Sequence, residues 1–175
     1  ALFLWRYSGS KLAAKLLSVV SYLFGLLPFS TWLLICYYII FHRTGGAGFA
    51  AAIFGLSFSY GISVYGTLMG SLGSIPAGQI DAAVAMGYDK WGALKNILLP
   101  QILPKFLAGM DGATVGHIKC TALVEFIAVQ DIQAVADMIS GQTSEPFLPL
   151  VLTAVTYVLL GAIASKLIER LRIRL

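Results

Sequence analysis

The sequence predicts an all-α membrane protein, a polytopic helix bundle that crosses a bilayer several times. Of its 175 residues, 58% are hydrophobic and 11% are charged, and the mean hydropathy is +0.85. A soluble domain carries about 45–50% apolar and about 25% charged residues, so this chain lacks the polar surface that water requires. Lipid offers no partner to unpaired backbone groups, and helices are therefore expected throughout the membrane.

Four complete spans are expected within one domain that covers residues 1–175. Three uncharged stretches are each long enough to supply the roughly 20 apolar residues that cross a bilayer. They predict spans over about 16–41, 49–70 and 146–165. A fourth span, 101–128, is more polar and should face the bundle interior or a water-filled path. Its ionisable residues are Lys105, Asp111, His117, Lys119 and Glu125.

The beginning of the chain is interpreted as the end of a further, truncated span. Residues 1–5 read ALFLW and are followed by Arg6. No long apolar run precedes a small-residue cleavage site, so a signal peptide is not expected.

The distribution of lysine and arginine predicts the orientation. An alternating path places ten basic residues on one side of the membrane and His42, Arg43 and an acidic loop on the other. The acidic loop carries Asp131, Asp137 and Glu145. The ten basic residues are Arg6, Lys11, Lys15, Lys90, Lys95, Lys105, Lys166, Arg170, Arg172 and Arg174. Positive loops remain in the cytoplasm, so residues 71–100 form a cytoplasmic loop and the C-terminus is cytoplasmic. An anionic membrane surface explains the net charge of +4 better than nucleic acid does.

Catalytic and metal chemistry are not expected. Cys36 and Cys120 lie in apolar surroundings without CxxC or histidine spacing, which favours packing roles. The glycine run at 45–48 lacks the lysine and Ser/Thr of a phosphate-binding loop. Energy for any active transport must therefore come from another subunit.

The cytoplasmic loop contains a short predicted helix. Residues 76–100 read PAGQIDAAVAMGYDKWGALKNILLP. Alanines favour a helix over about 80–86, Asp81 suits its positive N-terminal end, and Gly87 would terminate it.

This loop resembles the EAA loop of ABC importer permeases. The family signature is Glu-Ala-Ala, three residues, Gly, nine residues and Ile-any-Leu-Pro, and here Asp81 replaces the glutamate. The resemblance implies a coupling helix that inserts into a cleft on a cytoplasmic ATPase subunit. The positions implied in coupling are Gly78, Gln79, Asp81, Ala82, Ala83, Gly87, Leu99 and Pro100.

Further stretches resemble the polar amino-acid permeases, in particular the histidine and lysine/arginine/ornithine group. They are IPAGQIDAA, HIKCTALVEFIAVQDI and SEPFLPLVLTAVTYVLL. Two departures concern substrate recognition. Residues 25–28 read GLLP where the family usually has Arg-Gly-any-Pro, and Ile62, Ser63, Gly66 and Met69 replace a usual Ala-Tyr, glutamate and arginine. Either the substrate differs, or a partner permease holds the main ligand contacts.

The resemblance implies a permease subunit of an ATP-driven, binding-protein-dependent importer of polar amino acids in the bacterial inner membrane, with basic amino acids as a narrower option. Transport would proceed by alternating access. The implied partners are a dimer of ABC ATPases that binds ATP and Mg, a second identical or different permease subunit, an extracytoplasmic solute-binding protein and membrane lipid. The chain itself is expected to be neither an enzyme nor a cofactor-binding protein. A passive channel, an ion-coupled secondary transporter and a membrane scaffold are the alternatives.

Candidate residues of the substrate path are Lys119, Thr121 and Glu125. In a continuous helix, Lys119 and Glu125 would lie about 9 Å apart, comparable with an extended amino acid and its hydration. The alternative is structural: Lys119 snorkels to the interface or pairs with Asp111 or Glu125, and His117 is a hydrogen-bonded packing residue.

Overall fold

The computed structural model describes residues 11–76 and 78–173, and all regular structure within these ranges is helical. The all-α prediction is confirmed. The elements are α2 (Lys11–Leu26), α3 (Phe29–Ile35), the π-helix η1 (Cys36–Ile40), α4 (Ala47–Gly73), α5 (Gly78–Ala85), α6 (Lys90–Ala93), the π-helix η2 (Leu94–Leu98), α7 (Leu99–Cys120), the 3-10 helix η3 (Thr121–Ile127), α8 (Ile132–Thr143) and α9 (Phe147–Ile173). The truncated span expected at residues 1–5, together with Arg6 and Arg174, lies outside the described residues.

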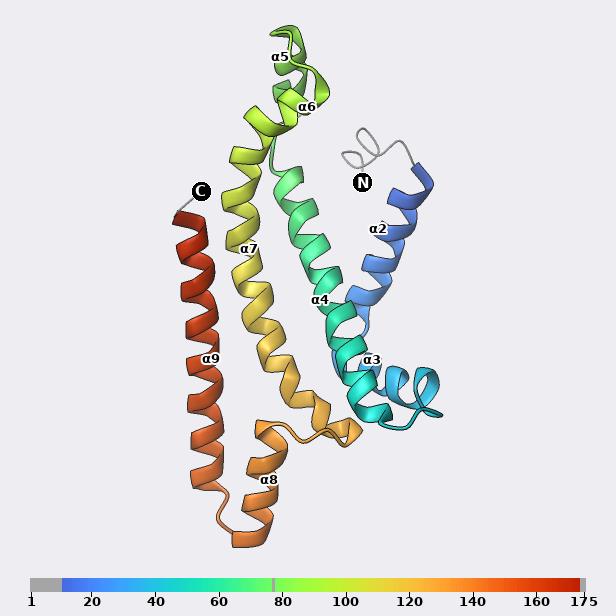
Figure 1. The fold of residues 1–175 in the computed structure, drawn as a ribbon, viewed down its shortest axis with the longest axis vertical. Helices are drawn as coiled ribbons and strands as arrows, with labels where there is room; N and C mark the ends of the chain where they lie inside the picture. The colour runs from blue at the N-terminus through green and yellow to red at the C-terminus, as the bar shows by residue number, and fades with distance from the viewer. Residues whose placement is uncertain (1–10, 77, 174–175) are drawn as a thin grey trace.

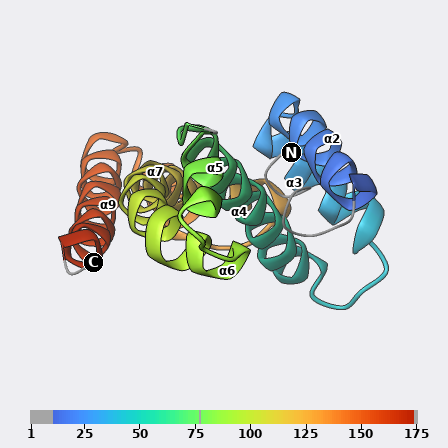
Figure 2. The same cartoon turned by 90° about the horizontal axis from the view of Figure 1, so that it is seen from above.

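The long helices form a single row. Helix α7 packs between α4 and α9, and α2 and α3 pack on the other side of α4 (Figure 1). Seen from above, α9, α7, α4 and α2 follow one another across the molecule (Figure 2). The short helices α5 and α6 project beyond one end of this row, and α8 lies at the opposite end.

Two described helices, α4 and α9, are long and apolar enough to span a membrane, and the bent pair Lys15–Leu26 and Phe29–Ile40 could supply a third. The expected spans 49–70 and 146–165 fall within α4 and α9. Helix α7 has 22 residues but is too polar to qualify, since it carries Lys105, Asp111 and Lys119.

The expected span 16–41 is not a single helix, because the chain turns by 108° between α2 and α3. Pro28 explains the break. It has extended backbone angles (φ −58°, ψ 137°), and proline disfavours the helical conformation of the residue before it. The Pro28 carbonyl then accepts a hydrogen bond from the Trp32 amide at 3.2 Å, which starts α3.

The other end of the expected span 101–128 also differs from a continuous α-helix. Helix α7 ends at Cys120 and the chain continues as η3 until Ala128, which has a left-handed φ of 59°. The acidic segment that follows, predicted as a loop, largely forms α8. Its start is capped by Asp131, whose Oδ1 accepts from the Ala134 amide at 2.9 Å.

A buried apolar cluster joins α3, η1, the start of α4 and η3. Its buried members are Leu33, Cys36, Ala51, Ala52, Val124 and Ile127. The packing role predicted for Cys36 is therefore confirmed. Close approach requires a glycine here, because a Cβ added to Gly48 would lie 2.5 Å from the Ile127 carbonyl oxygen. Aromatic rings of α2, α3 and α4 continue the packing, and Trp32 Nε1 donates to the Gly55 carbonyl at 3.1 Å.

Candidate functional site

The first candidate site is the hairpin formed by α5, α6 and η2, residues 78–98, which we term the tip hairpin. It stands at the end of the row of long helices, and its two ends continue toward α4 and α7 (Figure 1). Helices α5 and α6 contact each other, and Ala83, Ala93 and Leu98 are each buried to 1% exposure or less. The hairpin is thus a packed unit rather than an extended loop.

Gly87 ends α5 as the sequence predicted. Its φ of +87° is left-handed, a conformation that side-chain-bearing residues adopt at a cost. This turn lets the Gly87 amide donate to Val84 O at 3.0 Å and the Tyr88 amide to Ala83 O at 3.1 Å. Asp89 then begins α6, because its Oδ1 accepts from the Gly92 amide at 2.9 Å. Helix α5 spans Gly78–Ala85, close to the predicted 80–86.

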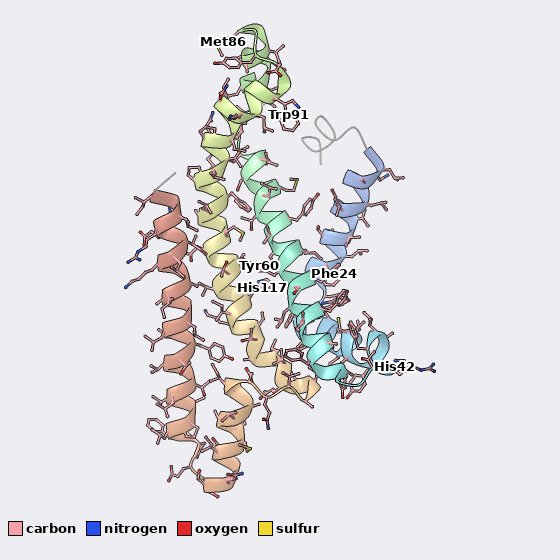
Figure 3. The ribbon with its side chains drawn as sticks, in the orientation of Figure 1. Phe24, His42, Tyr60, Met86, Trp91 and His117 are labelled. Carbon is pink, nitrogen blue, oxygen red and sulfur yellow. The ribbon has the colours of Figure 1, made fainter. Side chains whose placement is uncertain are left out.

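The tip hairpin exposes four large apolar side chains. Met86 is 67% exposed and Trp91 is 74% exposed, and Val84 and Tyr88 are also exposed. Figure 3 shows Met86 and Trp91 together at this end of the molecule, far from His42 at the other end. From the sequence, Tyr88 and Trp91 were already interpreted as interfacial or partner-facing aromatics, whereas Val84 and Met86 were not singled out. Exposed large apolar side chains on a packed projection are typical of a docking surface.

The structure places the predicted coupling positions in two groups. Gly78, Gln79, Asp81, Ala82 and Ala83 lie on α5, with Gly87 directly after it, whereas Leu99 and Pro100 begin α7. Asp81 lies in the first turn of α5, as expected for a carboxylate near a helix N-terminus. Gln79 Oε1 is buried and has no hydrogen-bond partner within the described ranges.

Several basic residues gather at one end of the molecule. The ends of α2 and α9 that carry Lys15, Lys166, Arg170 and Arg172 lie at the same end as the tip hairpin (Figure 1). Helix α8, with Asp137, lies at the other end. This arrangement has the polarity that the lysine and arginine distribution predicted.

A second candidate site is a polar seam between α4 and α7. The hydroxyl groups of Tyr60 and Thr114 are 2.8 Å apart, and Ser59 Oγ lies 3.2 Å from His117 Nε2. Thr114 donates to Met110 O, so Tyr60 is the donor in the first contact. Figure 3 shows Tyr60 and His117 lying close to each other between the two helices.

His117 is hydrogen-bonded on both ring nitrogens, since its Nδ1 also lies 2.9 Å from the Ala113 carbonyl. A carbonyl only accepts, so Nδ1 carries the proton and a neutral ring would accept from Ser59 at Nε2. This matches the expectation of a hydrogen-bonded packing residue. The seam itself was missed, because its partners lie 54 and 58 residues apart in the chain.

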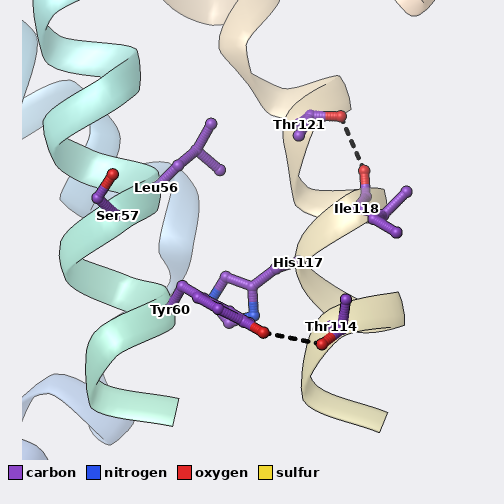
Figure 4. A pocket seen from close by; sticks show the side chains of 7 residues that line it. All are labelled: Leu56, Ser57, Tyr60, Thr114, His117, Ile118 and Thr121. Carbon is purple, nitrogen blue, oxygen red and sulfur yellow. Dashed lines mark hydrogen bonds between the residues drawn. The ribbon is translucent and has the colours of Figure 1, made fainter. Parts of the chain in front are cut away.

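The seam lines an open cavity of about 380 Å³. Its walls are Leu56, Ser57, Tyr60, Thr114, His117, Ile118 and Thr121 (Figure 4). Thr121, a predicted path residue, therefore faces α4, and its hydroxyl donates to Ile118 O at 2.8 Å. The volume lies in the range of about 300–1,000 Å³ found for small-ligand sites.

Lys119 and Glu125 do not join Thr121 in this cavity. Lys119 lines a different cavity of about 450 Å³ between α7 and α9, together with Gln133, Tyr157 and Ser165. Glu125 lies in η3, near enough to Asp131 and Asp137 to interact with both electrostatically. Because α7 ends between Lys119 and Glu125, the continuous helix assumed for their 9 Å spacing is not observed.

The alternative in which Lys119 pairs with Asp111 or Glu125 is not observed, and within the described residues Lys119 forms no ion pair. Asp111 instead accepts a hydrogen bond from Ser165 on α9 at 2.6 Å. A second link to α9 joins Tyr157 and Asp131, at 2.9 Å. Helix α7 and the segment that follows it are therefore hydrogen-bonded to neighbours on both sides. No cluster of three or more metal-ligating residues occurs within the described ranges.

Known proteins are similar to this chain in sequence and in fold. It is 28% identical over 126 residues to the arginine ABC transporter permease protein ArtQ of Escherichia coli. The aligned region covers 72% of this chain and 53% of that relative. It is 27% identical over 115 residues to the histidine/lysine/arginine/ornithine transport system permease protein HisQ of the same species, covering 66% of the chain and 50% of the relative. The chain thus spans about half the length of the curated relatives it matches.

A crystal structure of an amino acid ABC transporter with histidines has the same fold. The TM-score is 0.82 at 23% identity, and the match covers 99% of this chain and 83% of the other. The family model of the binding-protein-dependent transport system inner membrane component matches residues 2–174. The chain therefore belongs to the family of binding-protein-dependent transport system inner membrane components.

Proposed function

We propose that the chain is a permease subunit of an ATP-driven, binding-protein-dependent importer of polar amino acids. The family match over nearly the whole chain supports the transporter class, and the named substrates of ArtQ and HisQ support amino acids, basic ones included. The observation that carries the proposal is the tip hairpin, a packed helical projection with exposed large apolar side chains at the basic end of the molecule.

The tip hairpin docks on a cytoplasmic ATPase subunit. Burial of its exposed side chains, chiefly Met86 and Trp91, supplies the docking free energy, at roughly 25 cal/mol per Å² of apolar surface removed from water. Gly78, Gln79, Asp81, Ala82, Ala83 and Gly87 shape α5, whereas Leu99 and Pro100 join the hairpin to α7. ATP and Mg bind to the partner ATPases. When the ATPase dimer closes, it moves the tip hairpin. This movement shifts the long helices between the inward-open and outward-open states.

The substrate path follows α7. Thr121 contributes a hydroxyl to the α4–α7 cavity, Lys119 an ammonium group to the α7–α9 cavity, and Glu125 a carboxylate near the end opposite the tip hairpin. A solute-binding protein delivers the amino acid at that end, and a second permease subunit, identical or different, completes the path. The C-terminus and the tip hairpin lie in the cytoplasm, in line with the basic residues around them.

Reconstitution into liposomes tests this function. The chain, expressed together with an ABC ATPase and a solute-binding protein, should take up labelled arginine or histidine only when ATP is enclosed on the hairpin side. Uptake without ATP, or uptake driven by an ion gradient, would instead establish a channel or a secondary transporter.

A further inference from the structure

We propose that Lys105 is a positioning residue for the tip hairpin, which it serves by clamping together the two helices on which the hairpin stands. The inference rests on the proposed function, since it concerns how motion of the hairpin reaches the bundle. It begins from a single long-range contact at the base of the hairpin. Lys105 Nζ on α7 donates a hydrogen bond to Ser74 Oγ, the C-cap residue of α4, at 2.9 Å and across 31 residues of chain.

The Lys105–Ser74 hydrogen bond lies where the tip hairpin joins the two long helices. Helix α5 begins at Gly78, only four residues after Ser74, and η2 continues directly into α7 at Leu99. The hairpin therefore has two legs, α4 and α7, whose upper ends lie side by side beneath it (Figure 1). The hydrogen bond between Lys105 and Ser74 ties these ends together where the hairpin joins them.

Ser74 is oriented to receive the lysine. Its hydroxyl donates to Ser71 O at 2.7 Å, and its backbone amide donates to Gly70 O at 3.1 Å. Since the hydroxyl proton is used within α4, the oxygen lone pairs are left for an external donor. Lysine, which has three donors and no acceptor, fits this requirement.

The charge of Lys105 also suits its place. The C-terminal end of a helix carries a partial negative charge from its unpaired carbonyl groups, and a cation there is stabilising. Helix α4 has no basic residue in its own last turn. Lys105 brings the missing positive charge from the neighbouring helix.

Deeper in the bundle the same two helices are already held together. The Ser59–His117 and Tyr60–Thr114 contacts join them, and Gly109 allows close approach of Thr67. With Lys105 in place, α4 and α7 are linked from the base of the hairpin to the cavity. A displacement of the hairpin then moves both legs together, whereas without the clamp the hairpin can turn about the short connection after α4.

The experiment uses the complete reconstituted importer, with uptake and ATP hydrolysis measured in the same vesicles. Lys105→Met and Ser74→Ala should each lower the amount of amino acid taken up per ATP by about fivefold, the lower end of typical coupling between sites. The double variant should be no worse than the poorer single variant, because both remove one bond. Lys105→Arg should restore most of the ratio. Lys15→Met, which removes an exposed lysine of α2 outside the tip hairpin, is the matched control and should behave as wild type.

Hydrogen exchange on the purified full chain supplies a measurement independent of transport. Amides of α5 and α6 should exchange faster in Lys105→Met than in wild type or Lys15→Met. Unchanged exchange and an unchanged uptake-to-ATP ratio in Lys105→Met would overturn the positioning role while leaving the proposed function intact. A loss seen only in vesicles of anionic lipid would overturn it in favour of a lipid contact. Wild-type importer without ATP-driven uptake would overturn the proposed function and the positioning role together.

Discussion

Replacement of Gly87 by valine isolates the backbone geometry of the tip hairpin. Gly87 has a φ of +87°, and a Cβ added there would meet nothing within 4 Å. The penalty is therefore conformational rather than steric with respect to neighbours. A left-handed conformation costs an L-residue about 1–2 kcal/mol. That free energy corresponds to a factor of about 5–30 in the equilibrium between the observed turn and its alternatives.

Valine at position 87 should accordingly raise the apparent dissociation constant of the ATPase subunit by at most about 5- to 30-fold, because only the fraction of molecules with the observed turn can dock. Titration of the detergent-solubilised variant with purified ATPase, followed by substrate-stimulated ATP hydrolysis, measures this constant. Excess ATPase should restore the rate. Asparagine tolerates the left-handed region better than valine. The apparent dissociation constant of Gly87→Asn should therefore lie between those of the wild type and Gly87→Val.

Gly25→Val is the matched control. Gly25 also has nothing within 4 Å of an added Cβ, but its backbone is not in the left-handed region. The Gly25→Val variant should insert, dock and support transport as wild type does. The reasoning is refuted if Gly87→Val docks with wild-type affinity, or if Gly25→Val loses affinity to the same degree.

Three further predictions concern the bundle. Gly109→Leu should lower the melting temperature of the purified chain, at a cost of about 1–3 kcal/mol for overpacking, because even a Cβ at this position collides with the Thr67 methyl group; a second change, Thr67→Ala, should recover part of the loss. Glu125→Gln should selectively weaken uptake of arginine, lysine or histidine if the carboxylate contacts substrate. Normal uptake, with normal expression and ATPase activity, would show that Glu125 stabilises the bundle without contacting substrate. Arg172→Cys, in a background without the native cysteines, should react with an impermeant thiol reagent only after cells are opened, and efficient labelling of intact cells would reverse the proposed topology.

The sequence was most informative where a local rule determines the backbone. Gly87 was expected to end a short helix, and it does so in a left-handed turn with the expected hydrogen bonds. Long apolar stretches likewise predicted the regions that form α4 and α9. In both cases the deciding physics acts within a few residues or along one helix, so it can be recognised without knowledge of neighbours.

The misjudged regions depend on backbone exceptions or on tertiary contacts. Hydropathy treats Pro28 as one more residue of an apolar run, although its ring interrupts the helix there. The 3-10 segment η3 buries Val124 and Ile127 against α3, η1 and α4, partners that precede it by many residues. The polar seam is similarly hidden, since Ser59 and Tyr60 acquire meaning only when α4 is placed beside α7.

The close approach of Gly48 to the Ile127 carbonyl limits where residues can be inserted at the end of the molecule opposite the tip hairpin. The start of α4 rests directly on the end of η3, so extra residues after Ala128 would have to displace an already packed helix. The turn before α4 is different, because Gly45 and Gly46 have nothing within 4 Å of an added Cβ. An epitope or a fluorophore intended for the end opposite the tip hairpin therefore belongs in that turn, where the added chain can extend into solvent without separating the helices beneath it.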